Sequence, residues 1–374
     1  MKFPRLLGKT QTDRGKGIDY TFLTVVIMLL AYGLIMVFSA SSASAHYRMG
    51  DTFYFIKRQG ICAVIGLIGM YVFSVIHYKK YYKWALPFLG IVVILLVLVL
   101  TPLGVEVNGA SRWLGFSFLT FQPSELAKFA LIIFLAKYLT DNGKMLEKPG
   151  GFIANLVIIG LIAGLVLLEP HMSGAMVIAG VGVVILYVAG AKKLHLSILA
   201  VLGIVGAFGL IAIAPYRMAR FTTFLDPFAD MQGEGFQIVQ SLYAIGSGGF
   251  FGLGLGQSRQ KFLYLPEPQN DFIFSIICEE LGFFGALLVI VLFAVLIWKG
   301  IQIAMRAPDK FSSLLVAGII SLVAIQVILN IAVVTSSMPA TGVPLPFFSY
   351  GGTSLIIMLC GMGIVLNVTR HIKK

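Results

Sequence analysis

The sequence predicts an all-α polytopic membrane protein, and three observations support this fold class. Of its 374 residues, 58% are hydrophobic and only 12% are charged, about half the charged fraction of an ordinary soluble domain. Apolar windows of about 20 residues, the length that crosses the hydrocarbon core of a bilayer, recur along the whole chain. The net charge is +12, but Lys and Arg lie in short segments between these windows. That distribution is typical of membrane topology and anionic headgroups, and it does not indicate nucleic-acid binding.

Ten apolar windows predict ten transmembrane helices. The first window runs from Tyr20 to about residue 38. A cleaved signal peptide is the alternative, because Ala43, Ser44 and Ala45 resemble a cleavage site. We interpret the window as a retained helix, because it exceeds the usual apolar region of about 7–15 residues and more spans follow. The other spans are expected at about 59–76, 84–101, 123–139, 152–168, 174–190, 195–214, 271–298, 313–335 and 351–369.

Ten spans place both termini on one side of the membrane. That side holds 19 of the 28 Lys and Arg residues, against eight on the other side and one within a span. Since cytoplasmic loops carry the excess of Lys and Arg, the termini are predicted to be cytoplasmic. The expected organisation is a cytoplasmic tail over 1–20, a single membrane domain over 21–369 and a second cytoplasmic tail over 370–374.

The opposite, outward side is expected to carry the loops at about 40–57, 102–122, 169–173, 215–270 and 336–352. The segment 215–270 is too long for a structureless connection in a compact domain, so it is predicted to contain short helices. Residues 235–245 alternate like an amphipathic helix. Its predicted apolar side consists of Phe236, Val239, Leu242 and Tyr243.

Asp271 is the leading candidate for a catalytic residue. It lies where the long outward segment enters the eighth apolar window, and Pro266 and Pro268 stiffen the approach. A carboxylate at the edge of the membrane is costly and marks a functional site by default. Arg259 and Lys261 lie shortly upstream. We interpret Asp271 as a catalytic base.

A second polar cluster begins at Arg112 and Trp113 and continues into the fourth window. Glu125 and Lys128 are three residues apart, so they share one face of the expected helix. Two interpretations remain open. The pair is a structural ion pair, or Lys128 and Arg112 offer positive charge to a phosphate-bearing lipid.

The basic residues of the long outward segment are exceptions to the positive-inside pattern. They are Arg217, Arg220, Arg259 and Lys261. An anionic substrate such as a lipid pyrophosphate would explain them, and contact with lipid headgroups is the alternative. The glycine-rich stretch 246–256 resembles a phosphate-binding loop but lacks the preceding strand and the Lys-Ser/Thr ending. Close helix packing or a hinge is the favoured interpretation.

Several other polar residues favour structural roles. Glu279 and Glu280 are interpreted as structural anchors, and Gln326 and Asn330 as hydrogen-bonding bridges between helices. His171 is more typical of a turn residue than of a ligand. The three cysteines lie in apolar windows, and the five histidines are scattered, so neither a disulfide framework nor a histidine metal cage is expected. Irregular backbone over 339–352 at membrane depth predicts an outward-facing pocket that Asp271 could share.

These motifs together resemble the SEDS family of bacterial cell-wall proteins (FtsW, RodA, SpoVE), most closely its FtsW/SpoVE branch. The resemblance runs nearly end to end and rests on Asn108-Gly109 with Arg112-Trp113, Gln122-Pro-Ser-Glu125 with Lys128, Pro266-Glu-Pro-Gln-Asn-Asp271, Glu279-Glu280-Leu-Gly282, and Pro339 through Ser354. Two departures stand out. His171 replaces a frequent Asp, which leaves the role of that Asp undefined here, and Ser336-Ser337 replaces the more usual Gly-Leu.

The resemblance implies a peptidoglycan glycosyltransferase that polymerises lipid II at the outer face of the bacterial cytoplasmic membrane. The essential aspartate of the family corresponds to Asp271, its fourth-span polar residues to Glu125 and Lys128, and its outer-loop pair to Arg112 and Trp113. The full set expected to contact substrate or pyrophosphate is Arg112, Trp113, Glu125, Lys128, Arg217, Arg259, Lys261, Glu267, Thr341, Ser349 and Ser354. The implied partners are lipid II, the nascent glycan strand, a class B penicillin-binding protein and other division or sporulation proteins.

The implied reaction inverts the anomeric carbon, since an α-linked donor yields a β-1,4-linked polymer. Asp271 would take the proton of the acceptor hydroxyl. Arg or Lys, or a divalent cation such as Mg²⁺ or Mn²⁺, would neutralise the leaving pyrophosphate. Two rival functions are a lipid II flippase, which predicts a polar path across the whole membrane, and a non-catalytic scaffold for a transpeptidase, which predicts that Asp271 is dispensable.

Overall fold

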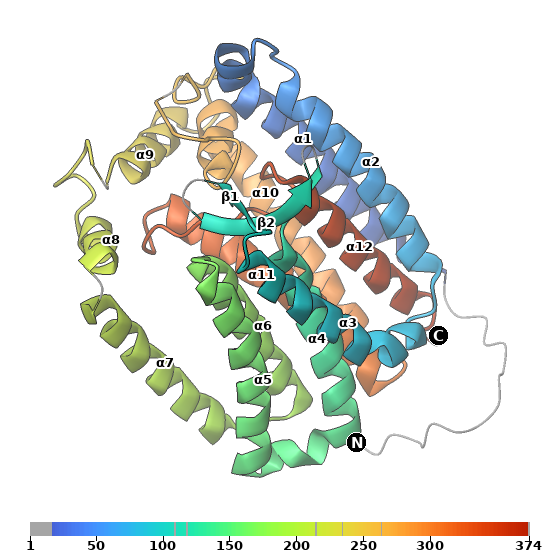
Figure 1. The fold of residues 1–374 in the computed structure, drawn as a ribbon. Coiled ribbons are helices and arrows are strands. Elements are labelled where there is room, and N and C mark those ends of the chain that lie inside the picture. Colours follow the sequence, from blue (N-terminus) through green and yellow to red (C-terminus); the bar gives the residue numbers. More distant parts are fainter. Residues whose placement is uncertain are drawn as a thin grey trace.

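A computed structural model describes residues 17–107, 110–116, 119–213, 215–233, 235–262 and 264–372. Within these ranges the chain forms ten helices of 18 residues or more, two shorter helices and a small sheet (Figure 1). The long helices are α1 (Tyr20–Met49), α2 (Tyr54–Val75), α3 (Lys79–Val99), α4 (Pro123–Asn142), α5 (Pro149–Leu168), α6 (Met172–Ala189), α7 (Lys193–Ile213), α10 (Ile273–Met305), α11 (Lys310–Val334) and α12 (Gly352–Thr369). The short helices are α8 (Pro215–Leu225) and α9 (Phe236–Gly248), and a 3₁₀ turn follows α4 at Gly143–Glu147.

The helical membrane class is confirmed, and each predicted span coincides with one long helix. Eight of these helices are both long and apolar enough to cross a bilayer, counted over the described residues. Helix α4 has the length but carries Glu125, Lys128 and Lys137. In α7 the apolar stretch runs over Lys193–Gly203. The count of ten spans and the division into tails and one membrane domain therefore stay predictions.

The core lies where α11 and α12 pack against α2, α4 and α10. Helices α11 and α12 are the most buried spans, and α12 runs alongside α2 in Figure 1. Glycines allow this close approach. A Cβ at Gly66 would lie 2.5 Å from the Leu359 side chain, and a Cβ at Gly363 would lie 2.3 Å from the Met70 carbonyl oxygen. Small residues at such contacts let helix backbones approach within a membrane, where hydrophobic burial does not drive helix association.

Both ends of the described chain lie at one end of the bundle. The backbone N–H of Asp19, just before α1, donates a hydrogen bond of 3.2 Å to Thr369 Oγ1 at the end of α12. Contacts among the predicted outward loops occur at the opposite end. For example, Arg48 pairs with Glu267 at 2.7 Å, and Arg112 contacts the turn at Glu169. The shared location of these loops agrees with the predicted topology.

The first helix is longer than predicted. The expected loop at 40–57 is helical as far as Met49, and Gly50 ends α1 in the left-handed conformation that glycine adopts without steric cost. The serine-rich segment stays helical because Ser39, Ser41 and Ser44 are buried against neighbouring elements. Ser39 Oγ, for instance, donates to the Glu280 carboxylate at 2.6 Å. Polar composition alone had suggested a loop.

The loop after α3 contains a three-stranded antiparallel sheet that the sequence analysis did not predict. Its strands are β1 (Val105–Val107), β2 (Ala110–Phe116) and β3 (Leu119–Phe121), in the order β1-β2-β3. A signal for it existed in the sequence. Val105 and Val107 alternate with Glu106, and the Asn-Gly dipeptide that follows is a strong hairpin signal.

The predicted helix in the long outward segment is present as α9, but its buried face differs from the prediction. Ile238, Val239 and Ala244 are almost fully buried, whereas Tyr243 is 48% exposed. Ser241 also lies on the buried face and donates to the carbonyl of Val334 at 2.8 Å. Val239 is buried as predicted, but the buried face of α9 also includes the polar Ser241 and leaves Tyr243 exposed.

Candidate active site

Asp271 lies in the turn before α10, at the end of the bundle that holds the outward loops. The residue is half-buried, and none of the hydrogen bonds between described residues uses its carboxylate. Burial raises the pKa of Asp271 to about 6, and the positive charge of Arg112 partly opposes this rise. At neutral pH the carboxylate is therefore mostly ionised and more basic than an ordinary aspartate.

The backbone of Asp271 is fixed by Asn330 of α11. Asn330 Nδ2 donates to the carbonyl oxygen of Asp271 at 2.7 Å and to that of Val343 at 2.8 Å. Because Asn330 is 1% exposed, both hydrogen bonds are shielded from water. Asn330, which was predicted to bridge two helices, therefore links α11 to two loops. These hydrogen bonds hold the Pro/Gly loop at Val343 against Asp271.

Gly342 brings that loop directly against the Asp271 carboxylate. A Cβ at position 342 would lie 3.0 Å from Asp271 Oδ2. The carbonyl of Gly342 also accepts a hydrogen bond of 3.2 Å from Ser173 Oγ of α6. The loop is therefore held between the candidate base and α6. Thr341 precedes this contact, and its buried Oγ1 has no hydrogen-bond partner among the described residues.

Arg112 of β2 connects the sheet to the turn between α5 and α6. Its Nε donates to the Glu169 carbonyl at 3.2 Å, and its Nη2 donates to the Pro170 carbonyl. Trp113 is the next residue of the same strand, so its side chain points to the other face of the sheet. The two predicted substrate contacts therefore cannot act on the same face.

The Glu169 side chain is buried beside Arg112. Its two carboxylate oxygens have no hydrogen-bond partner in the described part of the chain. Burial raises the pKa of Glu169 to about 8, against the opposing effect of Arg112. Glu169 is consequently mostly protonated at neutral pH, and the positive charge of Arg112 is not cancelled by it.

Glu125 and Lys128 form a buried ion pair within α4. Lys128 Nζ lies 2.5 Å from Glu125 Oε1, and the two residues are 2% and 5% exposed. The Ser354 side chain also hydrogen-bonds the Glu125 carboxylate. The structure thus supports the ion-pair interpretation.

His171 lies next to this pair. Its Nδ1 is 3.2 Å from Gln122 Nε2 and 3.3 Å from Ser124 Oγ. Burial first and the Lys128 charge second lower the pKa of His171 to about 4. The ring is neutral, and its Nδ1 accepts from the Gln122 amide. This agrees with the prediction of a hydrogen-bonding turn residue.

A small polar cavity of about 10 Å³ joins these groups to the loop at Asp271, roughly the space of one water molecule. Its polar lining comes from Glu125, Lys128, His171, Ser173 and Gln326, and Gly342 closes it on the side of Asp271. The structure therefore brings Arg112, the Glu125–Lys128 pair and Thr341 into one contiguous region around Asp271.

Lys261 belongs to a different, buried cluster. Its ammonium is 3.0 Å from Glu280 Oε1 and donates to the Gly256 carbonyl at 2.6 Å, and the residue is 3% exposed. Glu279 accepts hydrogen bonds from Ser258 Oγ at 2.5 Å and from the backbone N–H of Arg259 at 2.9 Å. The two glutamates thus anchor the outward loop, as predicted, whereas Lys261 faces Glu280 rather than Asp271.

The glycine-rich stretch packs against α10, in agreement with the favoured interpretation. Helix α10 is interrupted at Gly282, whose φ is 64°. The freed carbonyls of Glu279 and Glu280 accept from the N–H groups of Leu253 and Gly254 at 3.0 and 2.9 Å. A Cβ at Gly252 would lie 2.2 Å from the Glu280 carbonyl oxygen, so close approach requires glycine there. The interruption is tolerated because the loop satisfies the freed backbone groups.

The remaining predicted contacts lie outside this region or hold loops in place. Glu267 accepts from Arg48 at 2.7 Å and from Gln269 at 3.0 Å, and Ser349 Oγ accepts from the Leu345 N–H at 2.7 Å. The Arg259 side chain is exposed. Arg217 lies on α8, and its side chain is outside the described residues, as is that of Arg220.

Sequence reasoning missed Glu169, Ser173 and the contact of Gly342, because each depends on a partner distant in sequence.

The sequence matches the FtsW/RodA/SpoVE family of cell cycle proteins over residues 20–374. The chain belongs to this family. Its relatives include stage V sporulation protein E of Bacillus subtilis, 47% identical over 94% of this chain and 97% of the relative. Another is the probable peptidoglycan glycosyltransferase FtsW of a Geobacter species, 41% identical over 96% of this chain and 99% of that one.

Solved structures of family members share the fold. One comes from work on the structural coordination of polymerization and crosslinking by a peptidoglycan synthase complex. It has a TM-score of 0.79 and 30% identity, and the match covers 95% of this chain and 98% of that chain. The rod shape determining protein RodA of Thermus thermophilus matches with a TM-score of 0.71 and 28% identity, over 96% and 98% of the two chains. The expected family and its fold are therefore established.

Proposed function

We propose that this protein is a peptidoglycan glycosyltransferase that polymerises lipid II into β-1,4-linked glycan strands. The observation that carries the proposal is the Asp271 carboxylate. It belongs to a half-buried residue where the outward loops converge, none of the hydrogen bonds between described residues uses it, and burial and the charge of Arg112 set its pKa. Relatives named as probable peptidoglycan glycosyltransferases support the reaction class.

In this mechanism Asp271 acts as the general base. The 4-hydroxyl oxygen of the acceptor GlcNAc attacks C1 of the donor MurNAc, and its proton passes to the Asp271 carboxylate. The bond between C1 and the phosphate oxygen breaks, and its electron pair leaves with undecaprenyl pyrophosphate. Attack from the face opposite the leaving group inverts the anomeric carbon. A pKa of about 6 suits a base that works near neutral pH.

Arg112 is the cation that we assign to the leaving pyrophosphate. Its Nε and Nη2 donate to neutral carbonyl groups, its positive charge acts on the Asp271 carboxylate, and burial keeps the neighbouring Glu169 mostly protonated at neutral pH. Lys128, in contrast, is already neutralised by Glu125. Among the described residues no group of three or more His, Cys, Asp or Glu side chains could hold a metal ion. We derive no step through a metal.

The proposed orientation places both termini in the cytoplasm and Asp271 at the outer face of the cytoplasmic membrane. The excess of Lys and Arg on the terminal side supports this orientation. The proposed partner is a membrane-anchored class B penicillin-binding protein that crosslinks the new strands. A structural relative from a complex that coordinates polymerization with crosslinking supports this partnership.

The decisive experiment is polymerisation of fluorescent lipid II by the purified full-length protein, alone and with its transpeptidase. Asp271→Asn is expected to abolish strand formation. Asp51→Asn, which changes an exposed outward carboxylate paired with Lys57, serves as the matched control. Lipid II translocation in proteoliposomes is measured in parallel. Undiminished polymer from the Asp271 variant would overturn the proposal, and translocation lost with Asp271 would favour a transporter.

A further inference from the structure

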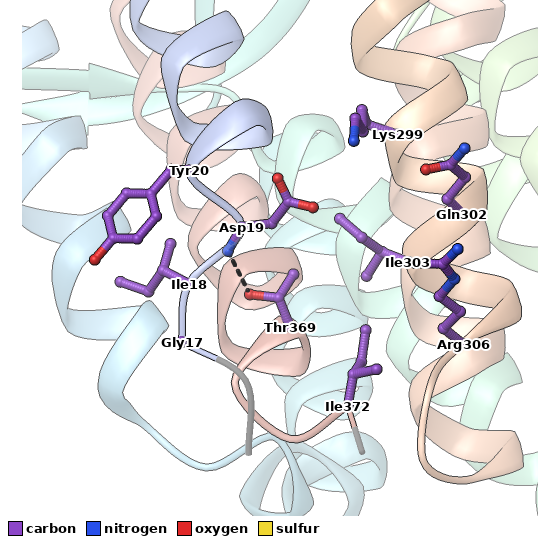
Figure 2. Close-up of a pocket in the computed structure, with 10 residues that line it drawn as sticks. All are labelled: Gly17, Ile18, Asp19, Tyr20, Lys299, Gln302, Ile303, Arg306, Thr369 and Ile372. Carbon is purple, nitrogen blue, oxygen red and sulfur yellow. Dashed lines mark hydrogen bonds between the residues drawn. The ribbon is translucent and has the colours of Figure 1, made fainter. Parts of the chain in front are cut away.

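A cavity of about 310 Å³ lies at the end of the bundle opposite Asp271, where α1 begins and α10 and α12 end. This volume is at the lower end of the range for small-molecule sites. Figure 2 shows its walls. The carboxylate of Asp19, just before α1, points toward Lys299 of α10, and the α10 wall continues with Gln302 and with Arg306 just past the end of the helix. Tyr20 also lines the cavity, with its ring directed away from α10. Buried Thr369 and Ile372 form another side.

The charges of the cavity are separated by sign. Lys299, Gln302 and Arg306 are spaced three and seven residues along α10, so they line one face of that helix. On the facing wall, Asp19 caps α1, and its Oδ1 accepts from the Phe22 N–H at 3.0 Å. None of the ion pairs between described residues joins Asp19 to Lys299 or Arg306. A cationic wall and a single carboxylate therefore face each other across open space.

The cavity lies at the depth of lipid headgroups. Helix α10 is interrupted at Gly282, and its continuous part after the interruption spans about 35 Å. This exceeds the hydrocarbon core of about 30 Å, so its last turn extends into the interface. Trp298 and Tyr20 beside the cavity are 57% and 71% exposed. Exposed aromatic residues of this kind are typical of the membrane–water boundary.

We propose that this cavity binds the headgroup of an aminophospholipid. The lipid phosphate lies between Lys299 and Arg306, and Gln302 donates a hydrogen bond to it. The primary ammonium of the headgroup pairs with Asp19 across the cavity. A headgroup that carries only negative charge would interact favourably with Lys299 and Arg306 alone. The Asp19 carboxylate would repel it. The site is independent of the proposed glycosyltransferase chemistry, because it lies at the other end of the bundle.

The test is native mass spectrometry of the purified full-length protein in detergent, with equimolar phosphatidylethanolamine and phosphatidylglycerol. The wild type is expected to retain several-fold more phosphatidylethanolamine. Asp19→Asn is the sharpest variant, because asparagine caps helices as well as aspartate does while removing the charge. It is expected to lower phosphatidylethanolamine retention to the phosphatidylglycerol level.

The double variant Lys299→Gln/Arg306→Gln is expected to lose both lipids. The matched control is Lys80→Gln, which removes an exposed positive charge from the same end of the bundle, at the start of α3 and outside the cavity. Its lipid retention should equal that of the wild type, and the Tm of each variant verifies folding. Equal retention of the two lipids by the wild type, or unchanged retention by folded Asp19→Asn, would overturn the proposal.

Discussion

Asp271 and the pair Glu279–Glu280 are carboxylates only eight or nine residues apart, yet the fold treats them in opposite ways. The two glutamates are at most 1% exposed and are surrounded by donors from Ser39, Ser258 and Lys261. Asp271 is half-buried, and none of the hydrogen bonds between described residues uses its carboxylate, whereas its backbone carbonyl accepts a hydrogen bond from Asn330.

This difference separates a structural carboxylate from one available for catalysis. A buried carboxylate with saturated hydrogen bonds has no lone pair left for a substrate proton, and removing it disrupts its partners. A carboxylate that is fixed through its backbone keeps its oxygens free. Burial then raises its proton affinity, as at Asp271. A charged residue at membrane depth is therefore a candidate functional residue. Its hydrogen-bond partners show whether its role is structural or catalytic.

The largest expected effect is on catalysis at Asp271. Asp271→Asn is expected to lower kcat by about 10²- to 10⁴-fold, the usual contribution of a general base, without lowering Tm. Glu279→Gln should retain activity within a few-fold, because the amide oxygen can still accept from the Arg259 N–H while the amide NH₂ donates to Ser258 Oγ, a hydroxyl that can also accept. Lipid II polymerisation rates and Tm values for both variants measure this contrast. A comparable loss of activity in the two variants would contradict the distinction between a catalytic Asp271 and a structural Glu279.

The second expected effect is on stability at Glu280. Glu280→Gln leaves the buried ammonium of Lys261 without a counter-charge, which costs about 3–5 kcal/mol in comparable buried pairs. The variant should show a markedly lower Tm in detergent, and Lys261→Met/Glu280→Leu should recover much of the loss. Lys57→Gln, at an exposed ion pair with Asp51, is the control and should leave Tm unchanged. A Glu280→Gln variant with wild-type Tm contradicts the anchoring role.

The acid limb of the pH profile provides a third test. Asp271 accepts a proton only when ionised, so kcat/KM should fall about tenfold per pH unit below a pKa of about 6. Arg112 lowers this pKa, so Arg112→Gln should move the limb to higher pH as well as slowing the reaction. Rates with lipid II between pH 4.5 and 7 measure both shifts. A limb near pH 4 would indicate that the base is a solvated carboxylate elsewhere.

A smaller effect is expected at alkaline pH. Glu169 is protonated below its pKa of about 8, and its ionisation at higher pH would cancel the charge of Arg112. Activity should therefore decline a few-fold as pH rises past 8. Glu169→Gln keeps the side chain neutral, so this variant should lose the alkaline limb and keep the acid one. If the decline persists in the variant, Glu169 is not its source.

The sequence predicted the spans well because hydropathy acts locally: each long helix coincides with an apolar window. It also identified Glu279 and Glu280 as anchors, since charges in an apolar helix need partners. It could not reveal contacts between residues distant in sequence. The fold places Lys261 against Glu280, and strand alternation directs Arg112 and Trp113 to opposite faces of the sheet. The helical segment around Ser39 likewise has a distant partner, because Ser39 Oγ donates to the Glu280 carboxylate.

The contact of Gly342 with Asp271 is another contact between distant residues that the sequence does not reveal. A substitution at Gly342 is expected to have the smallest effect of the variants considered. Nothing in the sequence reveals that its missing side chain makes room for Asp271 Oδ2, 3.0 Å from where a Cβ would lie. Gly342→Ala should shift that carboxylate by a few tenths of an ångström and lower kcat a few-fold, with Tm and lipid II KM nearly unchanged. Gly351→Ala is the matched control in the same loop, because its Cβ would make an ordinary 3.7 Å contact with Ser354. Equal activity of the two variants would mean that the position of the Asp271 carboxylate is not set by this loop, and that the backbone contact with Asn330 is sufficient to hold it.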